Sequence, residues 1–564
     1  MVRRILGVFF REYRGLHEAA FLLGLSAFSA QLLALIRDRL LATSFGAGQT
    51  LDIYYAAFRL PDFIYVLVGS FVSVNVLVPF IAERLAGHGE KGEVRKLLGP
   101  VALFFGIVVF CFAVVAFFLL PYAAPLLVPG FSAEATSEFI DLSRILLLSP
   151  ILLGFSNLLG SVTQSLRRFF VYALSPILYN IGIIFGIIAL FPKYGLRGIT
   201  FGVIIGALLH AAIQIPTVLR SGFFPKPKEF FGSFQVVKKV AALSLPRTIA
   251  LGTQQIMVMF FIAMASSMAA GSIAVFNFAY NLQSVPLALI GVSYSMAAFP
   301  TLSRLFAEGE RKQFVRYISI AARHIMFWSL PAAALFIILR AQIVRTLLGA
   351  GAFSWQDTRL VAAVFAIFSI SVVAQSLVLL FVRGYYAAGK TRKPLLVNIL
   401  SLLVSVASAP WFLYLFKTSD GFREFISEIF RVGDLSHTEV LALPMAFSLG
   451  SLLNLFLLSA LFKRDFKEDY ISLRRTLAES LGAALLAGFV AYQGLRIFDN
   501  VYDLTTVVGV FLQGLLAGIL GIIAAIFFLF FIKNKELVEV RGVATSRLWA
   551  KPPVLPSPEE NINT

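Results

Sequence analysis

Eight charged side chains lie within stretches of this 564-residue sequence that are otherwise apolar. A charge at bilayer depth costs about 2.5–3.5 kcal/mol on insertion scales, so it usually faces a cavity and marks a functional site. Arginine presents a planar fork that matches the oxygens of phosphate or carboxylate with two hydrogen bonds. The excess of arginine over aspartate therefore predicts a cavity for an anionic, phosphate-bearing substrate. The basic members are Arg37, Arg39, Arg59, Arg144, Arg247 and Arg383, and the acidic ones are Asp38 and Asp52.

Local spacing gives some of these residues a more specific interpretation. Arg37 and Asp38 interrupt the apolar run LLALIRDRLLATSFG. Arg59 follows Asp52 by two helical turns, which places both on one helix face. Asp52 has a second interpretation, as an acid that stabilises a helix N-terminus. Arg247 follows a proline that would kink its helix and free a backbone carbonyl.

The remaining arginines have a plainer alternative. Arg39 and Arg144 could extend their side chains to the membrane interface, and so could Arg383, which lies close to the expected cytoplasmic end of its helix. We expect the substrate site to comprise Arg37, Asp38, Asp52, Arg59, Arg247 and Arg383.

The composition identifies the elements that must position these residues. The chain is 59% hydrophobic and only 14% charged, with a mean hydropathy of +0.86. Long apolar runs exclude a soluble enzyme and a transmembrane barrel, and they predict an all-α polytopic membrane protein. About fourteen transmembrane helices are expected, at 20–42, 51–82, 97–121, 138–164, 170–191, 199–219, 238–266, 270–302, 318–340, 358–388, 394–416, 437–462, 474–494 and 503–532.

The distribution of basic residues predicts the orientation. With fourteen spans, alternate loops and the two ends hold 33 Lys and Arg, whereas the opposite loops hold 9. Cytoplasmic loops collect basic residues, so both termini are expected in the cytoplasm. The same bias explains most of the net charge of +18, so no nucleic-acid partner is needed.

Two sequence echoes predict an internal repeat. The segments ending at Pro61 and Pro286 resemble each other, as do those around Pro176 and Pro394, at offsets of 225 and 218 residues. Each offset covers six spans, which predicts two parallel six-helix lobes that rock around a central substrate. The expected parts are a cytoplasmic amphipathic segment (1–19), an N-lobe (20–220), a cytoplasmic linker (221–237), a C-lobe (238–462), spans 13 and 14 (463–532) and a cytoplasmic tail (533–564). The tail from residue 541 is expected to be disordered.

The sequence carries no enzyme signature. There is no HExxH motif, no P-loop, and a single cysteine, Cys111. We therefore expect a protein that is not an enzyme, with no cofactor and no metal site. Transport would be driven by an ion gradient, the membrane potential or a substrate gradient.

Several short motifs occur in a characteristic order. They are Ile36-Arg37-Asp38, Phe45-Gly-Ala-Gly48, Leu51-Asp52, Ala57-Phe58-Arg59-Leu60-Pro61, Arg168-Phe169, Leu302-Ser303-Arg304, Leu348-Gly349-Ala-Gly351-Ala-Phe353, and Arg383-Gly-Tyr-Tyr386 followed by Thr391 and Pro394. Their order through the first twelve spans resembles the MurJ/MviN family, the lipid II flippases of the multidrug/oligosaccharidyl-lipid/polysaccharide exporter (MOP) superfamily.

The resemblance implies a function and a location. The implied substrate is lipid II, an undecaprenyl-pyrophosphate-linked peptidoglycan precursor, moved from the inner to the outer leaflet of the bacterial cytoplasmic membrane. A groove for its lipid tail would involve spans 13 and 14. Membrane lipids and cell-wall synthesis proteins would be the partners.

The sequence also departs from this family. Gln31 and Asn281 stand where members often have arginine, and residues 63–70 are uncharged. Arg247 would replace part of the missing charge. Two alternatives to lipid II transport therefore stay open: a flippase for another lipid-linked oligosaccharide or a small-molecule exporter of the same superfamily, and a membrane scaffold that does not transport.

Overall fold

The computed structural model describes residues 16–88, 91–232, 234–466 and 473–549. Within these ranges the chain is helical and contains no strand, which confirms the predicted all-α class. Most of the predicted amphipathic segment at 1–19 lies outside the described residues, as does the tail from 550.

Contacts divide the chain into two compact units. Unit 1 comprises residues 1–282, 344–368 and 391–454. This division does not test the predicted lobes, whose boundaries stay a prediction. The helices wholly within unit 1 are α2 (Leu16–Phe45), α3 (Gln49–Ala57), α4 (Arg59–Gly69), α5 (Val74–His88), α6 (Lys91–Leu127), α7 (Ala133–Leu146), α8 (Leu148–Ser165), α9 (Phe169–Phe185), η1 (Gly186–Leu190), α10 (Phe191–Tyr194), α11 (Leu196–Ala212), α12 (Ile215–Ser221), η2 (Pro227–Phe231), α13 (Phe234–Ser266), α19 (Arg392–Thr418), α20 (Asp420–Phe430) and η4 (Thr438–Leu441).

Unit 2 comprises residues 283–343, 369–390 and 455–564. It contains η3 (Leu287–Val292), α15 (Ser293–Ala307), α16 (Arg311–Ile338), α22 (Arg474–Phe498), α23 (Val507–Phe531) and α24 (Lys535–Trp549). Four helices contribute residues to both units: α14 (Ser272–Pro286), α17 (Arg340–Leu348), α18 (Trp355–Ala387) and α21 (Ala442–Asp465). Within unit 2, α22 and α23 pack closely against each other.

Eleven helices among the described residues are long and apolar enough to cross a membrane. They match eleven of the predicted spans, so the exact count of fourteen is not confirmed. The unmatched predictions are 20–42, 51–82 and 238–266. The second of these is not one helix but three, because the chain breaks at Phe58 and again at 70–73. These three segments carry most of the charged residues proposed as the substrate site, and charge lowers their hydropathy.

The surface of α6 shows why this fold needs lipid around it. Phe110, Phe118 and Leu126 are 61%, 68% and 79% exposed. Soluble proteins rarely expose such a continuous apolar face. The exposed face matches the apolar environment of a bilayer, where only helices and closed barrels satisfy every backbone polar group.

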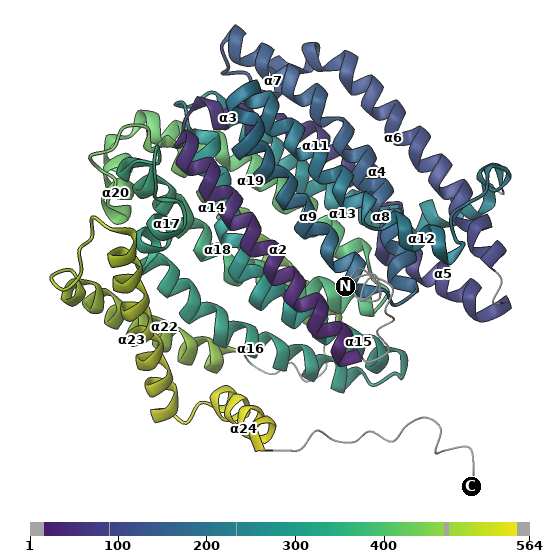
Figure 1. The fold of residues 1–564 in the computed structure, drawn as a ribbon. Helices are drawn as coiled ribbons and strands as arrows, with labels where there is room; N and C mark the ends of the chain where they lie inside the picture. The colour runs from purple at the N-terminus through teal and green to yellow at the C-terminus, as the bar shows by residue number, and fades with distance from the viewer. Residues whose placement is uncertain (1–15, 89–90, 233, 467–472, 550–564) are drawn as a thin grey trace, which may run out of the picture. The chain divides into compact units, whose positions relative to one another are not determined.

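Glycines let α9 and its continuation η1 approach α11 closely, and α9 and α11 lie side by side (Figure 1). Gly182 and Gly186 face Gly202 and Gly206, each pair being four residues apart. A Cβ on Gly202 would lie 2.8 Å from the carbonyl oxygen of Gly182. Small residues at this spacing are the usual means of packing membrane helices without a hydrophobic driving force.

The C-terminal tail differs from its prediction. The disorder expected from residue 541 is wrong for 541–549, because α24 continues to Trp549. Leu537 and Val540 of α24 pack against an apolar cluster of unit 2 that includes Phe327 and Leu529. Apolar burial therefore stabilises a helix that its polar composition did not predict.

The contact between α9 and α11 leads to a stability prediction. Gly202→Ala should destabilise the protein by about 1–3 kcal/mol, because the added methyl group overpacks the helix contact. The matched control is Gly106→Ala on α6, where an added Cβ meets nothing within 4 Å. Thermal unfolding in detergent checks this. Equal melting temperatures for the two variants would contradict the close approach.

Candidate substrate-binding site

Arg37 and Asp38 form an ion pair on α2. Nε and Nη2 of Arg37 both donate to Oδ1 of Asp38, at 3.0 and 2.8 Å, and Nη1 donates to Oδ1 of Asn180 on α9 at 3.3 Å. The other carboxylate oxygen of Asp38 accepts from Nδ2 of Asn281 on α14 at 3.1 Å. The Arg37 side chain is 21% exposed and that of Asp38 is 6% exposed. Arg37 is therefore the member of the pair that an entering anion can reach.

Arg59 lies at the start of α4, directly after the break at Phe58. Its Nε donates to the carbonyl oxygen of Tyr55 at 3.2 Å, and its Nη2 donates to Oδ1 of Asn277 on α14. The side chain is partly buried. These acceptors are uncharged, so the positive charge of Arg59 is held in place without being neutralised.

Asp52 has a different partner from the one its spacing predicts. Its two carboxylate oxygens accept from the backbone N–H of Gly271 at 2.6 Å and of Ala274 at 2.8 Å. The residue is 3% exposed. Asp52 therefore stabilises the N-terminus of α14, where unpaired N–H groups and the helix dipole both favour an anion. Asp52 is therefore an acid at a helix N-terminus, which was its second interpretation. The helix that it stabilises, however, is distant in sequence.

One face of α14 thus contacts three charged residues of the first helices. Its N-terminus donates to Asp52, Asn277 accepts from Arg59, and Asn281 donates to Asp38. Asn277 and Asn281 are four residues apart, which places them one turn apart on the same face. Neutral amides at these positions orient the charged groups and leave the arginine charge available.

The C-terminal part of α2 and the residues just after it pack tightly against two other segments of unit 1. The N–H of Ala352 donates to the carbonyl oxygen of Thr43 at 2.9 Å, and Arg39 donates to the carbonyl oxygen of Thr346. Gly271 has a φ of +93°, and a Cβ there would overlap the carbonyl oxygen of Ala47. This end of unit 1, which we call the Gly46 end (residues 43–48, 271 and 346–352), is closed by backbone contacts.

The other two predicted site residues are not brought to this cluster by any described contact. Arg247 lies in α13, but its side chain lies outside the described residues. Arg383 lies in the part of α18 that belongs to unit 2, where its side chain is partly buried. Their participation stays a prediction.

Sequence reasoning missed the neutral partners of the site. Asn180, Asn277 and Asn281 were not identified as site residues, although each forms a hydrogen bond with one of the charged groups. The four-residue spacing of Asn277 and Asn281 within an apolar helix was a usable signal.

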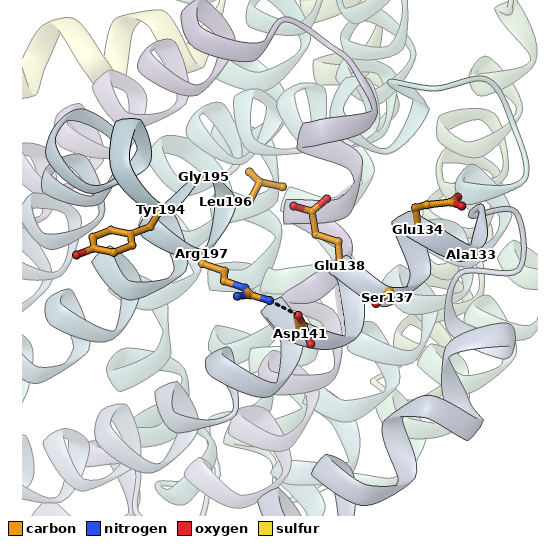
Figure 2. A pocket seen from close by; sticks show the side chains of 9 residues that line it. All are labelled: Ala133, Glu134, Ser137, Glu138, Asp141, Tyr194, Gly195, Leu196 and Arg197. Atoms are coloured by element: carbon orange, nitrogen blue, oxygen red, sulfur yellow. Dashed lines mark hydrogen bonds and ion pairs between the residues drawn. The ribbon is translucent and has the colours of Figure 1, made fainter.

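An open pocket of about 710 Å³ lies elsewhere in unit 1, between the N-terminal part of α7 and the Gly195 turn (Figure 2). It is lined by Glu134, Glu138 and Asp141, and Arg197 forms an ion pair with Asp141 at 2.5 Å (Figure 2). None of the six predicted site residues lines it. Its acidic lining would repel phosphate, so it is a poor candidate for the predicted anion site.

Comparison with solved structures identifies the fold of the protein. A structure described as lipid II flippase MurJ in an inward closed conformation matches with a TM-score of 0.73 and 22% identity, covering 91% of this chain and 99% of that chain. An inward-facing multidrug resistance MATE family transporter of the MOP superfamily matches with a TM-score of 0.63 and 15% identity, covering 78% and 94%. The fold is that of a helical membrane transporter.

Sequence comparison then gives the family. The family model described as lipid II flippase MurJ matches residues 41–513. A probable lipid II flippase MurJ from Rhizobium tropici is 26% identical over 404 residues, covering 68% of this chain and 73% of the relative. The corresponding protein from Haemophilus influenzae is 26% identical over 391 residues, covering 66% and 76%. The chain belongs to the lipid II flippase MurJ family, which confirms the resemblance seen in the motifs.

The closed Gly46 end leads to a cross-linking prediction. In a Cys111→Ser background, cysteines at Thr43 and Ala352 should be joined by a short bifunctional maleimide, because the two backbones are hydrogen-bonded. Gel mobility after cleavage at an engineered site between the two positions detects the link. Each single-cysteine variant is the control. Failure to cross-link in every ligand state would contradict this closure.

Proposed function

We propose that this chain moves lipid II, an undecaprenyl-pyrophosphate-linked peptidoglycan precursor, from the inner to the outer leaflet of the bacterial cytoplasmic membrane. It acts as a transporter and not as an enzyme. Membership of the lipid II flippase MurJ family supports the substrate. The observation that carries the proposal is the Arg37 fork, which is partly exposed and paired with a single carboxylate oxygen.

In this proposal, the pyrophosphate binds by replacing Asp38 as the hydrogen-bond partner of Arg37. In the empty carrier, Asp38 holds the Arg37 fork and limits the cost of a buried unpaired cation. Phosphate oxygens then replace Asp38 as acceptors, because they match the bidentate geometry of arginine. Asp38 keeps its hydrogen bond from Asn281 during this exchange. Arg59, whose charge is not neutralised by its amide and carbonyl partners, binds the second phosphate.

Alternating access follows from the contacts of α14. In the predicted division, α2 to α4 belong to the N-lobe (20–220) and α14 belongs to the C-lobe (238–462). The contacts of Asp38, Asp52 and Arg59 with α14 would then join the lobes. With both termini in the cytoplasm, the Gly46 end faces the outer leaflet. Opening towards that leaflet would require these contacts to break, and the pyrophosphate would compete with Asn277 for Arg59.

The rest of the chain completes the cycle in this proposal. Arg247 and Arg383 add positive charge to the cavity, and spans 13 and 14 (463–532) hold the lipid tail. No nucleic acid takes part. Cell-wall synthesis proteins that supply or consume lipid II are the proposed partners.

One observation favours a second candidate substrate. Asn281, which stands where family members often have arginine, donates a hydrogen bond to Asp38. This position therefore contributes an amide instead of a cation. A related lipid-linked oligosaccharide, with a different sugar or a less charged headgroup, would need fewer cations in the site.

Replacing Arg37 tests the proposal directly. In cells depleted of their own flippase, Arg37→Ala should abolish the appearance of lipid II in the outer leaflet. Arg37→Lys should reduce it by about tenfold, because a charged bidentate contact worth about 1.5–3 kcal/mol is lost while the charge stays. The measurement is lipid II accessible at the outer leaflet per inserted protein.

The control for this experiment is Arg144→Ala. Arg144 lies on α7 and donates to the carbonyl oxygen of Phe117, so its loss should leave transport unchanged. Wild-type transport in both Arg37 variants would overturn the proposed site. Failure of the wild-type chain to restore cells that need lipid II export, despite normal insertion, would favour another lipid-linked substrate or a scaffold that does not transport.

The orientation has its own test. In a Cys111→Ser background, a cysteine at Glu308 should be shielded from an impermeant thiol reagent in intact cells, because the 33:9 bias places this loop in the cytoplasm. A cysteine at Ala133 should be labelled. Both positions are exposed, so burial does not explain a difference. The reverse pattern would invert the orientation.

A further inference from the structure

Helix α20 presents three stripes of side chains, and the members of each stripe are four residues apart, so that they share one face. One stripe is acidic and exposed, a second is apolar and exposed, and a third is apolar and turned towards the protein. The acidic stripe is Asp420, Glu424 and Glu428, the exposed apolar stripe is Phe425 and Ile429, and the inner stripe is Phe422, Ile426 and Phe430. A surface helix in water needs only an inner and a polar face, so the exposed apolar stripe indicates a third environment.

Contacts at both ends hold α20 in place within unit 1. At its start, the side-chain oxygen of Ser419 accepts from the N–H of Phe422 at 3.3 Å, and the ring of Phe422 packs edge-on against that of Phe416 on α19, with centroids 5.2 Å apart. At its end, Arg359 of α18 donates to the carbonyl oxygen of Arg431. The helix is therefore held in one orientation, in which its acidic and apolar exposed stripes both face away from the protein.

The helix before α20 carries a stripe that marks the bilayer. α19 is one of the eleven helices long and apolar enough to cross a membrane. Exposed side chains recur along it every three or four residues, at Leu396, Leu400, Leu403, Ala407, Trp411 and Tyr414. Trp and Tyr are enriched where a membrane helix meets the membrane–water interface. The stripe therefore predicts that the hydrocarbon region ends close to Tyr414.

The short connection sets the depth at which α20 begins. Only Ser419 separates the end of α19 at Thr418 from the start of α20 at Asp420. From Tyr414 to Thr418 the helix rises by about 6 Å. The headgroup region extends about 5–8 Å beyond the hydrocarbon on each side of a bilayer. α20 therefore begins at the depth of the headgroups, where an amphipathic helix buries its apolar side chains at the boundary with the acyl chains.

The exposed apolar side chains of α20 are large, and Phe425 and Ile429 are 61% and 52% exposed. Anionic headgroups would repel the acidic stripe beside them, so apolar burial has to supply the attraction to lipid. We propose that α20 lies in the membrane surface, with Phe425 and Ile429 inserted between lipid chains and the acidic stripe in water. Because Arg359 lies in the second turn of α18, just after residues 346–352, this surface is on the side of the Gly46 end.

Fluorescence quenching in lipid nanodiscs tests the proposal on the purified full chain. In a Cys111→Ser background, an environment-sensitive fluorophore is attached to Phe425→Cys or to Ile429→Cys. Its emission should shift to the blue and should be quenched by a nitroxide placed high on the lipid acyl chains, but not by iodide in the water. Both positions are exposed, so neither substitution removes a packing contact of the core.

The matched controls are Glu424→Cys and Glu428→Cys, each one residue away on the acidic stripe. Their fluorophores should show the reverse pattern, with quenching by iodide and little quenching by the nitroxide. Leu403→Cys, on the stripe of α19, is the reference for a position that faces lipid. Equal quenching by iodide at all four positions of α20 would overturn the proposal.

Labelling in intact cells separates lipid from a protein partner. If Phe425→Cys and Ile429→Cys are open to water in nanodiscs but shielded from an impermeant thiol reagent in cells that label Glu424→Cys, another protein covers the stripe and the proposal is wrong. Quenching by the nitroxide that appears only with anionic lipid would also contradict it, because headgroup charge would then hold the helix. None of these measurements depends on which substrate is transported, so their failure would leave the proposed function standing.

Discussion

A charge inside a membrane protein must be met by an opposite charge or by oriented dipoles, and this requirement organises the contacts of α14. The backbone N–H groups at its N-terminus meet Asp52, and two amides one turn apart meet Arg59 and Asp38. The only described ion pair among these residues joins Arg37 to Asp38. The structure thus gives Asp38 and Asp52 partners for both carboxylate oxygens and leaves positive charge at the position where an anion would bind.

This arrangement connects binding to movement. If the predicted lobes are the moving parts, Arg59 both recognises the substrate and joins the lobes, through its hydrogen bond to Asn277. A substrate that draws Arg59 from Asn277 would then loosen a contact of the closed state. The neutral amides of Asn277 and Asn281 suit this role, since breaking a hydrogen bond to an amide costs less than separating a buried ion pair.

The sequence predicted the class of fold because apolar length and loop charge are properties of single segments. Eleven predicted spans match helices, and the mismatches fall where charges lower the hydropathy, as in α2 with Arg37 and Asp38. The contacts of the site, in contrast, join segments that are far apart in the sequence. Asp52 binds N–H groups of a helix that begins about 220 residues later, and no local spacing indicates such a pairing. Asp38 beside Arg37 was predictable, because adjacent opposite charges in an apolar run need each other.

The central claim is that Asp38 and the pyrophosphate compete for the Arg37 fork. A double-mutant cycle on the binding of undecaprenyl pyrophosphate tests this claim most directly, with Asp38→Asn and Arg37→Lys made separately and together. Asp38→Asn alone should tighten binding, because it removes the competing negative charge and keeps the shape of the side chain and one acceptor oxygen. In the Arg37→Lys background, the same change should have a much smaller effect. An equal effect of Asp38→Asn in both backgrounds would show that the two residues act independently, and would contradict the account.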